Sequence, residues 1–323
     1  MANLAQVAVC TADLPGTLRT FVEVLGFADA GGRARWGADA ARIQELPTGD
    51  DTRCMMWWLV GRQEFVQLEL FHHTCPAQRP RRPSWRPCDL GWVRFGVVVD
   101  DFDLAVERLH GAGLATLTPP MTADGGRRVC FREPGADAIV EIMEATSRFA
   151  GPGPALGYVT ASVADLETAR RYFGGAFELE EIDPVVVHRT EHEALWGLDG
   201  ARRTCAVFRA GAALIEVVQY ASPASRPPDP DALLSDQGIM NAAIGYRDRA
   251  RMVHAQAAAM ALGASATTAT PAVSGSVYLR LADGLSCEQL LVPPGLDAAY
   301  GFTAQARPSG AAPAHDPART RLG

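Results

Sequence analysis

The sequence predicts an α+β protein built from four tandem βαβββ modules, arranged as two pairs. First, an apolar strand that runs into an Asp and an amphipathic helix occurs four times. Second, further strand-like segments follow each helix. Third, the repeats are unevenly spaced, with 88 residues from Asp13 to Asp101, 64 from Asp101 to Asp165 and 83 from Asp165 to Asp248. Internal repetition of this kind indicates architecture before any single residue is interpreted.

The four joints between strand and helix are the clearest signal. They read QVAVCTADL (6–14), RFGVVVDDF (94–102), YVTASVADL (158–166) and NAAIGYRDR (241–249). An Asp at this place can cap the helix, because its carboxylate accepts the free backbone N–H groups of the first turn. We therefore expect a helix to begin directly after each Asp.

Alternating and apolar runs predict the remaining strands of each module. They cover 52–59 and 65–71, 127–131 and 138–143, 204–208 and 213–220, and 276–281 and 286–291. We expect each pair of modules to form a cupped mixed sheet around a cleft, with the helices outside.

Segments rich in Pro divide the chain. They suggest an N-terminal domain, 1–147, with modules 1–76 and 90–147, and a C-terminal domain, 156–294, with modules 156–223 and 238–294. Residues 303–323 are rich in Ala and Pro and poor in large apolar side chains, so we expect a disordered tail.

Composition favours a soluble, cytoplasmic protein. The 323 residues are 48% hydrophobic and carry a net charge of −7, which argues against nucleic-acid binding. No apolar run is long enough to span a membrane, and no signal-type segment opens the chain. The seven cysteines include no C-x-x-C motif, so we expect free thiols.

The chain resembles the vicinal oxygen chelate superfamily, which includes glyoxalase I, bleomycin-resistance proteins and extradiol dioxygenases. The four joints and the closing strands IVEIME (139–144) and LIEVVQY (214–220) carry the resemblance. It implies that paired modules surround a cleft. There a divalent metal is held by the first residue of strand one and a Glu on the last strand of each module, and acts as a Lewis acid.

Carrying those positions over gives eight candidate residues. The place seven residues before each Asp holds Gln6, Arg94, Tyr158 and Asn241, and the last strands supply Glu69 (or Gln67), Glu141, Glu216 and Glu288. With neighbouring modules paired, a first cleft would contain Gln6, Glu69, Arg94 and Glu141. A second cleft would contain Tyr158, Glu216, Asn241 and Glu288.

No His occupies a predicted ligand position, which argues against an iron site and extradiol cleavage. Arg94 would repel a divalent ion, so we expect it to pair with Glu141 or Glu69 or to hold an anionic substrate. No cofactor is firmly predicted. Glu216, Glu288 and Asn241 could hold Mg²⁺ or Mn²⁺ weakly through oxygen.

The second cleft is the favoured active site, with lyase or isomerase chemistry on a small oxygenated molecule. Glu216, Glu288 and Tyr158 would be the catalytic acid and base groups. The expected substrate-binding residues are Asn241, Arg94, Gln6, Glu141, Glu69 and Trp196. Two alternatives remain: a metal-dependent enzyme of glyoxalase or dioxygenase type, and a non-enzymatic binder like the bleomycin-resistance proteins.

The expected partner is a small molecule, with no nucleic acid or membrane, and a homodimer is left open. Histidines have lesser roles in this interpretation. His73 shares a strand face with Glu69 and is a second candidate ligand. His188 and His192 would be surface histidines near the mouth of a cleft.

Overall fold

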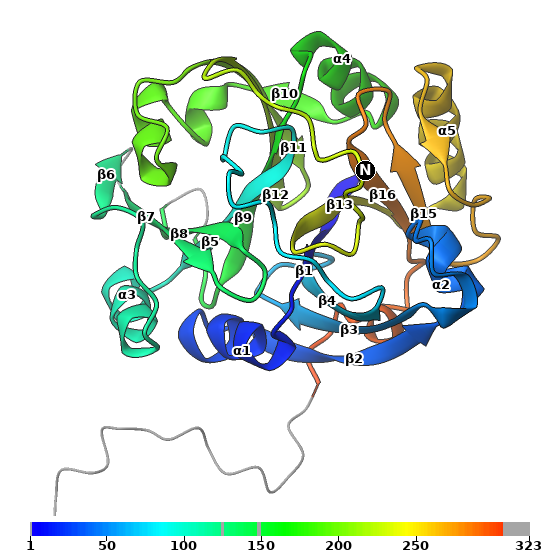
Figure 1. The fold of residues 1–323 in the computed structure, drawn as a ribbon, viewed down its shortest axis with the longest axis horizontal. Coiled ribbons are helices and arrows are strands. Elements are labelled where there is room, and N and C mark those ends of the chain that lie inside the picture. Colours follow the sequence, from blue (N-terminus) through cyan, green and yellow to red (C-terminus); the bar gives the residue numbers. More distant parts are fainter. Residues whose placement is uncertain (1, 124–125, 147–149, 306–323) are drawn as a thin grey trace, which may run out of the picture.

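The computed structural model describes residues 2–123, 126–146 and 150–305, and these form two eight-stranded mixed sheets (Figure 1). Sheet A has the order β14-β15-β16-β13-β1-β4-β3-β2, and sheet B has the order β10-β11-β12-β9-β5-β8-β7-β6. The predicted α+β fold of four βαβββ modules in two pairs is confirmed.

Sheet A contains the first and fourth modules. Its strands are β1 (Asn3–Cys10), β2 (Ala28–Trp36), β3 (Arg53–Val60), β4 (Gln67–Cys75), β13 (Gly238–Tyr246), β14 (Ser265–Ala266), β15 (Gly275–Arg280) and β16 (Ser286–Leu291). Sheet B contains the second and third modules. Its strands are β5 (Gly91–Val99), β6 (Met121–Ala123), β7 (Gly126–Glu133), β8 (Ala138–Glu144), β9 (Ala155–Ser162), β10 (Glu180–Ile182), β11 (Arg202–Ala210) and β12 (Ala213–Ser222).

One helix follows the first strand of every module. These are α1 (Leu14–Arg19), which continues as a π-helical turn (Thr20–Val24), α3 (Phe102–Gly111), α4 (Leu166–Arg170), with a second π-helical turn (Arg171–Ala176), and α5 (Arg249–Ala261). The expected Asp caps are present. The carboxylates accept the backbone N–H of Gly16, Leu104, Glu167 and Ala250 at 2.7–3.1 Å.

The pairing of modules differs from the prediction. Strand β1 pairs antiparallel with β13, and β5 pairs antiparallel with β9. The first module therefore joins the fourth and the second joins the third, so neither sheet corresponds to the expected half 1–147 or 156–294. The first strands of all four modules are similarly apolar, so the sequence does not state which of them become neighbours. The linkers 76–90 and 223–237 are long enough to cross between the sheets, whereas β8 and β9 lie in one sheet.

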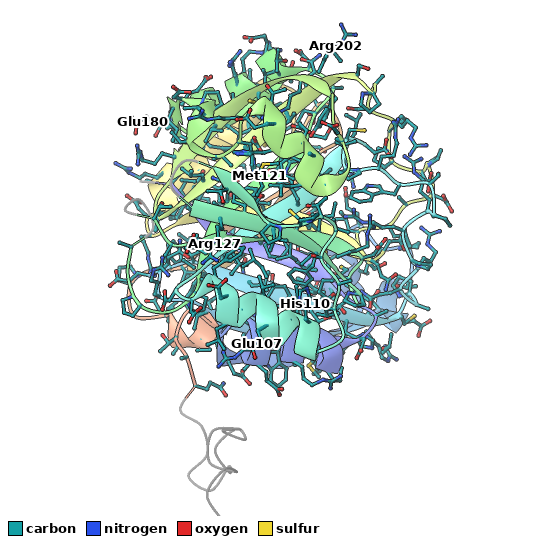
Figure 2. All side chains as sticks on the ribbon, turned by 90° about the vertical axis from the view of Figure 1, so that its left-hand side faces the viewer. Glu107, His110, Met121, Arg127, Glu180 and Arg202 are labelled. Carbon is teal, nitrogen blue, oxygen red and sulfur yellow. The ribbon has the colours of Figure 1, made fainter. Side chains whose placement is uncertain are left out.

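The helices cover the convex faces of the sheets, away from the polar concave faces. The main apolar core lies between these convex faces and contains helix and strand side chains from all four modules. Phe21 of the first module stacks on Phe95 of β5, with 6.0 Å between ring centroids. Tyr172 of the third module donates a hydrogen bond to the Leu262 carbonyl oxygen at 2.9 Å. Figure 2 shows the outer edge of sheet B, with Met121 of β6 and Arg127 of β7 above Glu107 and His110 of α3.

All seven cysteines are free thiols, as expected. Within the described ranges, no helix has the length and apolar character needed to cross a membrane. The expected disordered tail, 303–323, lies outside the described residues from position 306 onward. Its first part lies against sheet A, where the Gln305 backbone N–H donates to the Asp29 carbonyl oxygen at 2.8 Å.

Candidate functional site

Strand register places the predicted positions on the concave faces. In each module, the residue two places after the first-strand position pairs with the residue that carries the last-strand carboxylate. The pairs are Ala8 with Glu69, Gly96 with Glu141, Thr160 with Glu216, and Ala243 with Glu288. Because side chains alternate along a strand, both members of each set share one face. The same register identifies Glu69, rather than Gln67, as the equivalent of the other three glutamates.

Two four-residue sets follow from the observed pairing. Site A, on sheet A, consists of Gln6, Glu69, Asn241 and Glu288. Site B, on sheet B, consists of Arg94, Glu141, Tyr158 and Glu216. Each of the two clefts expected from the sequence therefore combined residues that lie on different sheets.

The same correction affects the expected chemistry. Glu216 cannot share a metal ion or a proton with Glu288 and Asn241, because they belong to different sheets. Tyr158 donates its hydroxyl hydrogen bond to Glu141 rather than to Glu216. The four residues of the expected second cleft are therefore divided between the two sheets.

In site B, Arg94 has a fixed carboxylate partner. Its Nη2 donates to Glu216 Oε2 at 2.8 Å, and both side chains are fully buried. Thr160 Oγ1 donates to the same oxygen at 2.7 Å. The Arg94 guanidinium lies 3.9 Å from the ring centroid of Trp196, a cation–π contact. Arg94 therefore pairs with Glu216, not with Glu141 or Glu69, and Trp196 belongs to site B.

The centre of site B is filled by His188, which the sequence placed at the surface. His188 lies between β10 and β11, and its Nδ1 and Nε2 are each 2.9 Å from carboxylate oxygens, of Glu216 and Glu141 respectively. It is 2% exposed and His192 is 0% exposed, so both surface assignments are wrong. Ionised carboxylates only accept hydrogen bonds, so the imidazole carries hydrogen on both nitrogens when both glutamates are ionised. An imidazolium then stands between the two last-strand carboxylates.

Further buried charges complete site B. Arg128 Nη1 donates to Glu141 Oε1 at 3.1 Å, and Arg203 forms an ion pair with Glu193. Burial alone would raise the pKa of Glu141, but the charges of His188 and Arg128 outweigh it and lower the pKa to about 2. His188 and Arg94 likewise hold the pKa of Glu216 well below its usual value, against the effect of burial. Both carboxylates are therefore ionised at neutral pH and hold no proton to give.

Site A has the opposite character, because it contains two carboxylates and no cation in contact with them. Trp58 Nε1 donates to Glu69 Oε1 at 2.8 Å. Gln6 Oε1, Glu288 Oε2 and both amide atoms of Asn241 are buried and have no hydrogen-bond partner. Among the described residues, Asn241 still lies close enough to Glu288 to lower the pKa of that carboxyl group. Unpaired buried polar atoms are rare and costly, so these atoms are available to a bound ligand.

Burial and mutual repulsion keep protons on site A. Removal from water raises the pKa of Glu69 to about 7, despite the hydrogen bond from Trp58. Burial and the nearby charge of Glu69 raise the pKa of Glu288 well above its usual value. Two carboxyl groups that interact in this way lose their protons in two separate steps, and the pKa of each step belongs to the pair rather than to one residue. At neutral pH the pair can both accept and donate a proton.

The donor set of site A suits a hard divalent cation. Its four side chains offer two carboxylates and two amide oxygens, the ligand types that Mg²⁺ and Mn²⁺ prefer. A cavity of about 30 Å³ lies beside Gln6, Glu69 and Glu288, room for an ion or a water molecule. Among the residues that the structure describes, no three His, Cys, Asp or Glu side chains gather to hold a metal.

His73 does not join these four residues. Its Nε2 lies 3.0 Å from Gln44 Oε1, and its ring stacks on Phe71, which stands between it and Glu69 on β4. Burial lowers the pKa of His73 to about 4. His73 is therefore a neutral core histidine.

Two arginines of the edge strand β2 line the mouth of site A. The Arg33 guanidinium lies 5.1 Å from the ring centroid of Trp58, and Arg35 is half-buried beside the cavity. Within the described part of the chain, neither arginine has a carboxylate within 4.0 Å. Neither arginine was predicted from the sequence, because the segment GGRARW (31–36) carries no strand signal apart from its alternation.

No protein-family model and no curated protein sequence matches the chain. Among solved structures, glyoxalase I from Zea mays is 13% identical, with a TM-score of 0.61 over 90% of this chain and 92% of that one. A Bacillus subtilis protein assigned provisionally as a dioxygenase is 12% identical, with a TM-score of 0.61 over 91% of this chain and 86% of that one. At this identity the likeness concerns the fold alone, and the chain shares the fold of these two structures.

Proposed function

We propose that the chain is an enzyme of lyase or isomerase type that moves a proton on a small, oxygenated, anionic organic molecule at site A. The observation that carries the proposal is the carboxyl pair Glu69 and Glu288, buried with raised pKa values on one concave face. A carboxyl group with a pKa near 7 is an efficient general base or acid at neutral pH.

The two carboxyl groups would have distinct roles. Glu69, with a pKa of about 7, would take a proton from a carbon next to a substrate carbonyl. Glu288, whose pKa burial raises well above its usual value, would donate a proton to the substrate oxygen or to the neighbouring carbon. Gln6 and Asn241 have unpaired amide atoms that would bind the two neighbouring oxygens of the substrate.

Arg33 and Arg35 support the choice of an anionic substrate. Both lie at the mouth of the cavity on β2 without a carboxylate partner among the described residues. A guanidinium matches a carboxylate or phosphate group in geometry and charge. They would hold the charged end of the substrate at the mouth, so that only its carbonyl end reaches the cavity of about 30 Å³.

A second candidate, the metal-dependent version of the same site, is favoured by the unpaired oxygens of Gln6 and Glu288. Gln6, Glu69, Asn241 and Glu288 would then hold a weakly bound Mg²⁺ or Mn²⁺. A bound ion would supply Lewis-acid polarisation of the substrate oxygens. Titration of the metal-free protein with MnCl₂, followed by electron paramagnetic resonance, measures this binding directly. Glu288→Gln should abolish it, whereas Glu216→Gln at site B should not.

Proton exchange tests the catalytic proposal. Pyruvate, hydroxypyruvate and uncharged hydroxyacetone would be incubated with the protein in D₂O, and loss of the protons next to the carbonyl followed by NMR. We expect exchange on the two anions, slowed by about 10²-fold or more in Glu69→Gln and Glu288→Gln. Glu107→Gln, on the exposed surface of α3, is the matched control.

Two outcomes would overturn the catalytic proposal. One is equal exchange by the wild type and Glu69→Gln. The other is binding of these compounds without any exchange, with and without MgCl₂, which would support the alternative of a small-molecule binder.

A further inference from the structure

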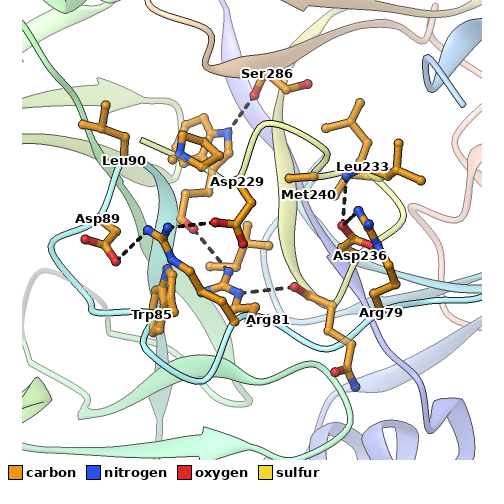
Figure 3. A pocket seen from close by; sticks show the side chains of 18 of the residues that line it. Arg79, Arg81, Trp85, Asp89, Leu90, Asp229, Leu233, Asp236, Met240 and Ser286 are labelled. Atoms are coloured by element: carbon orange, nitrogen blue, oxygen red, sulfur yellow. Dashed lines mark hydrogen bonds and ion pairs between the residues drawn. The ribbon is translucent and has the colours of Figure 1, made fainter. Parts of the chain in front are cut away.

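A larger cavity lies outside both sites, where the two long linkers meet the starts of β5, β13 and β16 (Figure 3). Its volume is about 370 Å³, within the usual range for small-molecule sites. None of the four residues of site A or of site B lines it. It is therefore a separate cavity, for which neither site provides a function.

The acidic side chains of this linker cavity are already neutralised. Four aspartates and four arginines line it. Each aspartate forms an ion pair with an arginine at 2.7–3.1 Å: Asp231 and Asp236 with Arg79, and Asp89 and Asp229 with Arg82. A cationic ligand would have to compete with these pairs for a carboxylate.

Arg81 is different, because no carboxylate lies within 4.0 Å of it in the described part of the chain. Its guanidinium stacks 4.2 Å from the ring centroid of Trp85, and its Nε donates to the Gln237 carbonyl oxygen at 3.2 Å. Nη2 makes a long hydrogen bond of 3.5 Å to the Trp92 carbonyl oxygen, and Nη1 has no partner. Burial lowers the pKa of Arg81 to about 10, so it is still a cation at neutral pH. A half-buried cation without a carboxylate in contact, among the described residues, carries a desolvation cost that a bound anion would offset.

Much of the remaining lining is apolar and includes flat side chains, beside the polar residues Gln237 and Ser286. Leu90 and Trp92 come from the first linker and β5, Ile239 and Met240 from β13, and Leu285 from the turn before β16. We propose that this linker cavity binds an aromatic carboxylate, with the carboxylate on Arg81 and the ring against the apolar wall. A single unpaired cation beside four aspartates favours a monoanion over a phosphate dianion.

Calorimetry with 2-naphthoate and its uncharged analogue 2-naphthamide tests the proposal. We expect 2-naphthoate to bind the wild-type chain at least about tenfold more tightly than 2-naphthamide. Arg81→Met should remove that preference, and Leu233→Trp, which fills the cavity from its half-buried lining, should weaken both ligands. Glu288→Gln, at site A, should leave 2-naphthoate binding unchanged.

Three results would overturn the proposal. They are no binding of 2-naphthoate to the wild type, equal affinity for the acid and the amide, and binding that survives in both Arg81→Met and Leu233→Trp. If Arg81→Met does not fold, Leu233→Trp and the comparison of acid with amide still decide the question. Glu288→Gln changes site A but not the linker cavity. A failure of the proposal for the linker cavity can therefore be distinguished from a failure of the proposed function.

Discussion

Glu69→Gln is expected to stabilise the protein above neutral pH while it removes the proposed base. In the folded chain, burial raises the pKa of Glu69 from 4.5 to about 7. The folded state therefore binds a proton that the unfolded state has lost, so wild-type stability falls as the pH rises from about 4.5 to about 7. Each unit of pKa is worth about 1.4 kcal/mol, so the free energy of unfolding loses about 3 kcal/mol over this range.

Glutamine keeps the acceptor for Trp58 Nε1 and the shape of the side chain, but it does not ionise. We expect Glu69→Gln to match the wild type near pH 4.5 and to exceed it by about 3 kcal/mol at pH 8. Urea unfolding followed by tryptophan fluorescence at several pH values measures this difference. Glu107→Gln is the control, because Glu107 is exposed on α3. Parallel curves for the wild type and Glu69→Gln against pH would refute the assigned burial effect.

Three further outcomes are expected. Glu216→Gln leaves the buried Arg94 without its counter-charge and should lower the free energy of unfolding by about 3–5 kcal/mol at pH 7, as measured in urea. The pKa of Glu141 is lowered from 4.5 to about 2 in the folded chain, so the ionised carboxylate stabilises the fold above about pH 4.5. This contribution to the free energy of unfolding should disappear as the pH falls from about 4.5 towards 2. Glu141→Gln should lack that acid-dependent loss in the same experiment. At site A, Arg33→Gln and Arg35→Gln should each raise the KM for an anionic substrate about tenfold with little change in kcat. A variant with the same KM as the wild type would contradict a role of that arginine in binding.

Repetition made most of the fold predictable from the sequence. Each Asp cap marked the end of one strand and the start of one helix, so the four first-strand positions could be counted without an alignment. Strand periodicity then placed the last-strand carboxylates on the same faces. Every one of these eight positions lies on a concave face in the structure. The sequence left only one of them ambiguous, the last-strand position of the first module, between Glu69 and Gln67.

The partners of these residues could not be predicted, because pairing between modules depends on long-range contacts. The strands β1, β5, β9 and β13 are all apolar and of similar length, so their local sequences do not show which strands become neighbours. His188 was missed for a related reason. It lies in an irregular segment between β10 and β11 that has no periodicity, and its depth depends on the two glutamates that it bridges. Charge counting could have suggested it, since Glu141 and Glu216 in one site require nearby cations.

Comparison of the two sites explains why equivalent positions favour different roles. In site B, Arg94 and the inserted His188 lie within hydrogen-bond distance of the carboxylates, so the charges are balanced inside the protein and both carboxylates stay ionised. In site A the nearest cations, Arg33 and Arg35, are at the mouth and touch neither carboxylate. Its proton balance therefore depends on what binds: a divalent ion would expel protons from Glu69 and Glu288, and an anion would draw them in. That dependence on a ligand, rather than the mere presence of glutamates, makes site A the one suited to chemistry.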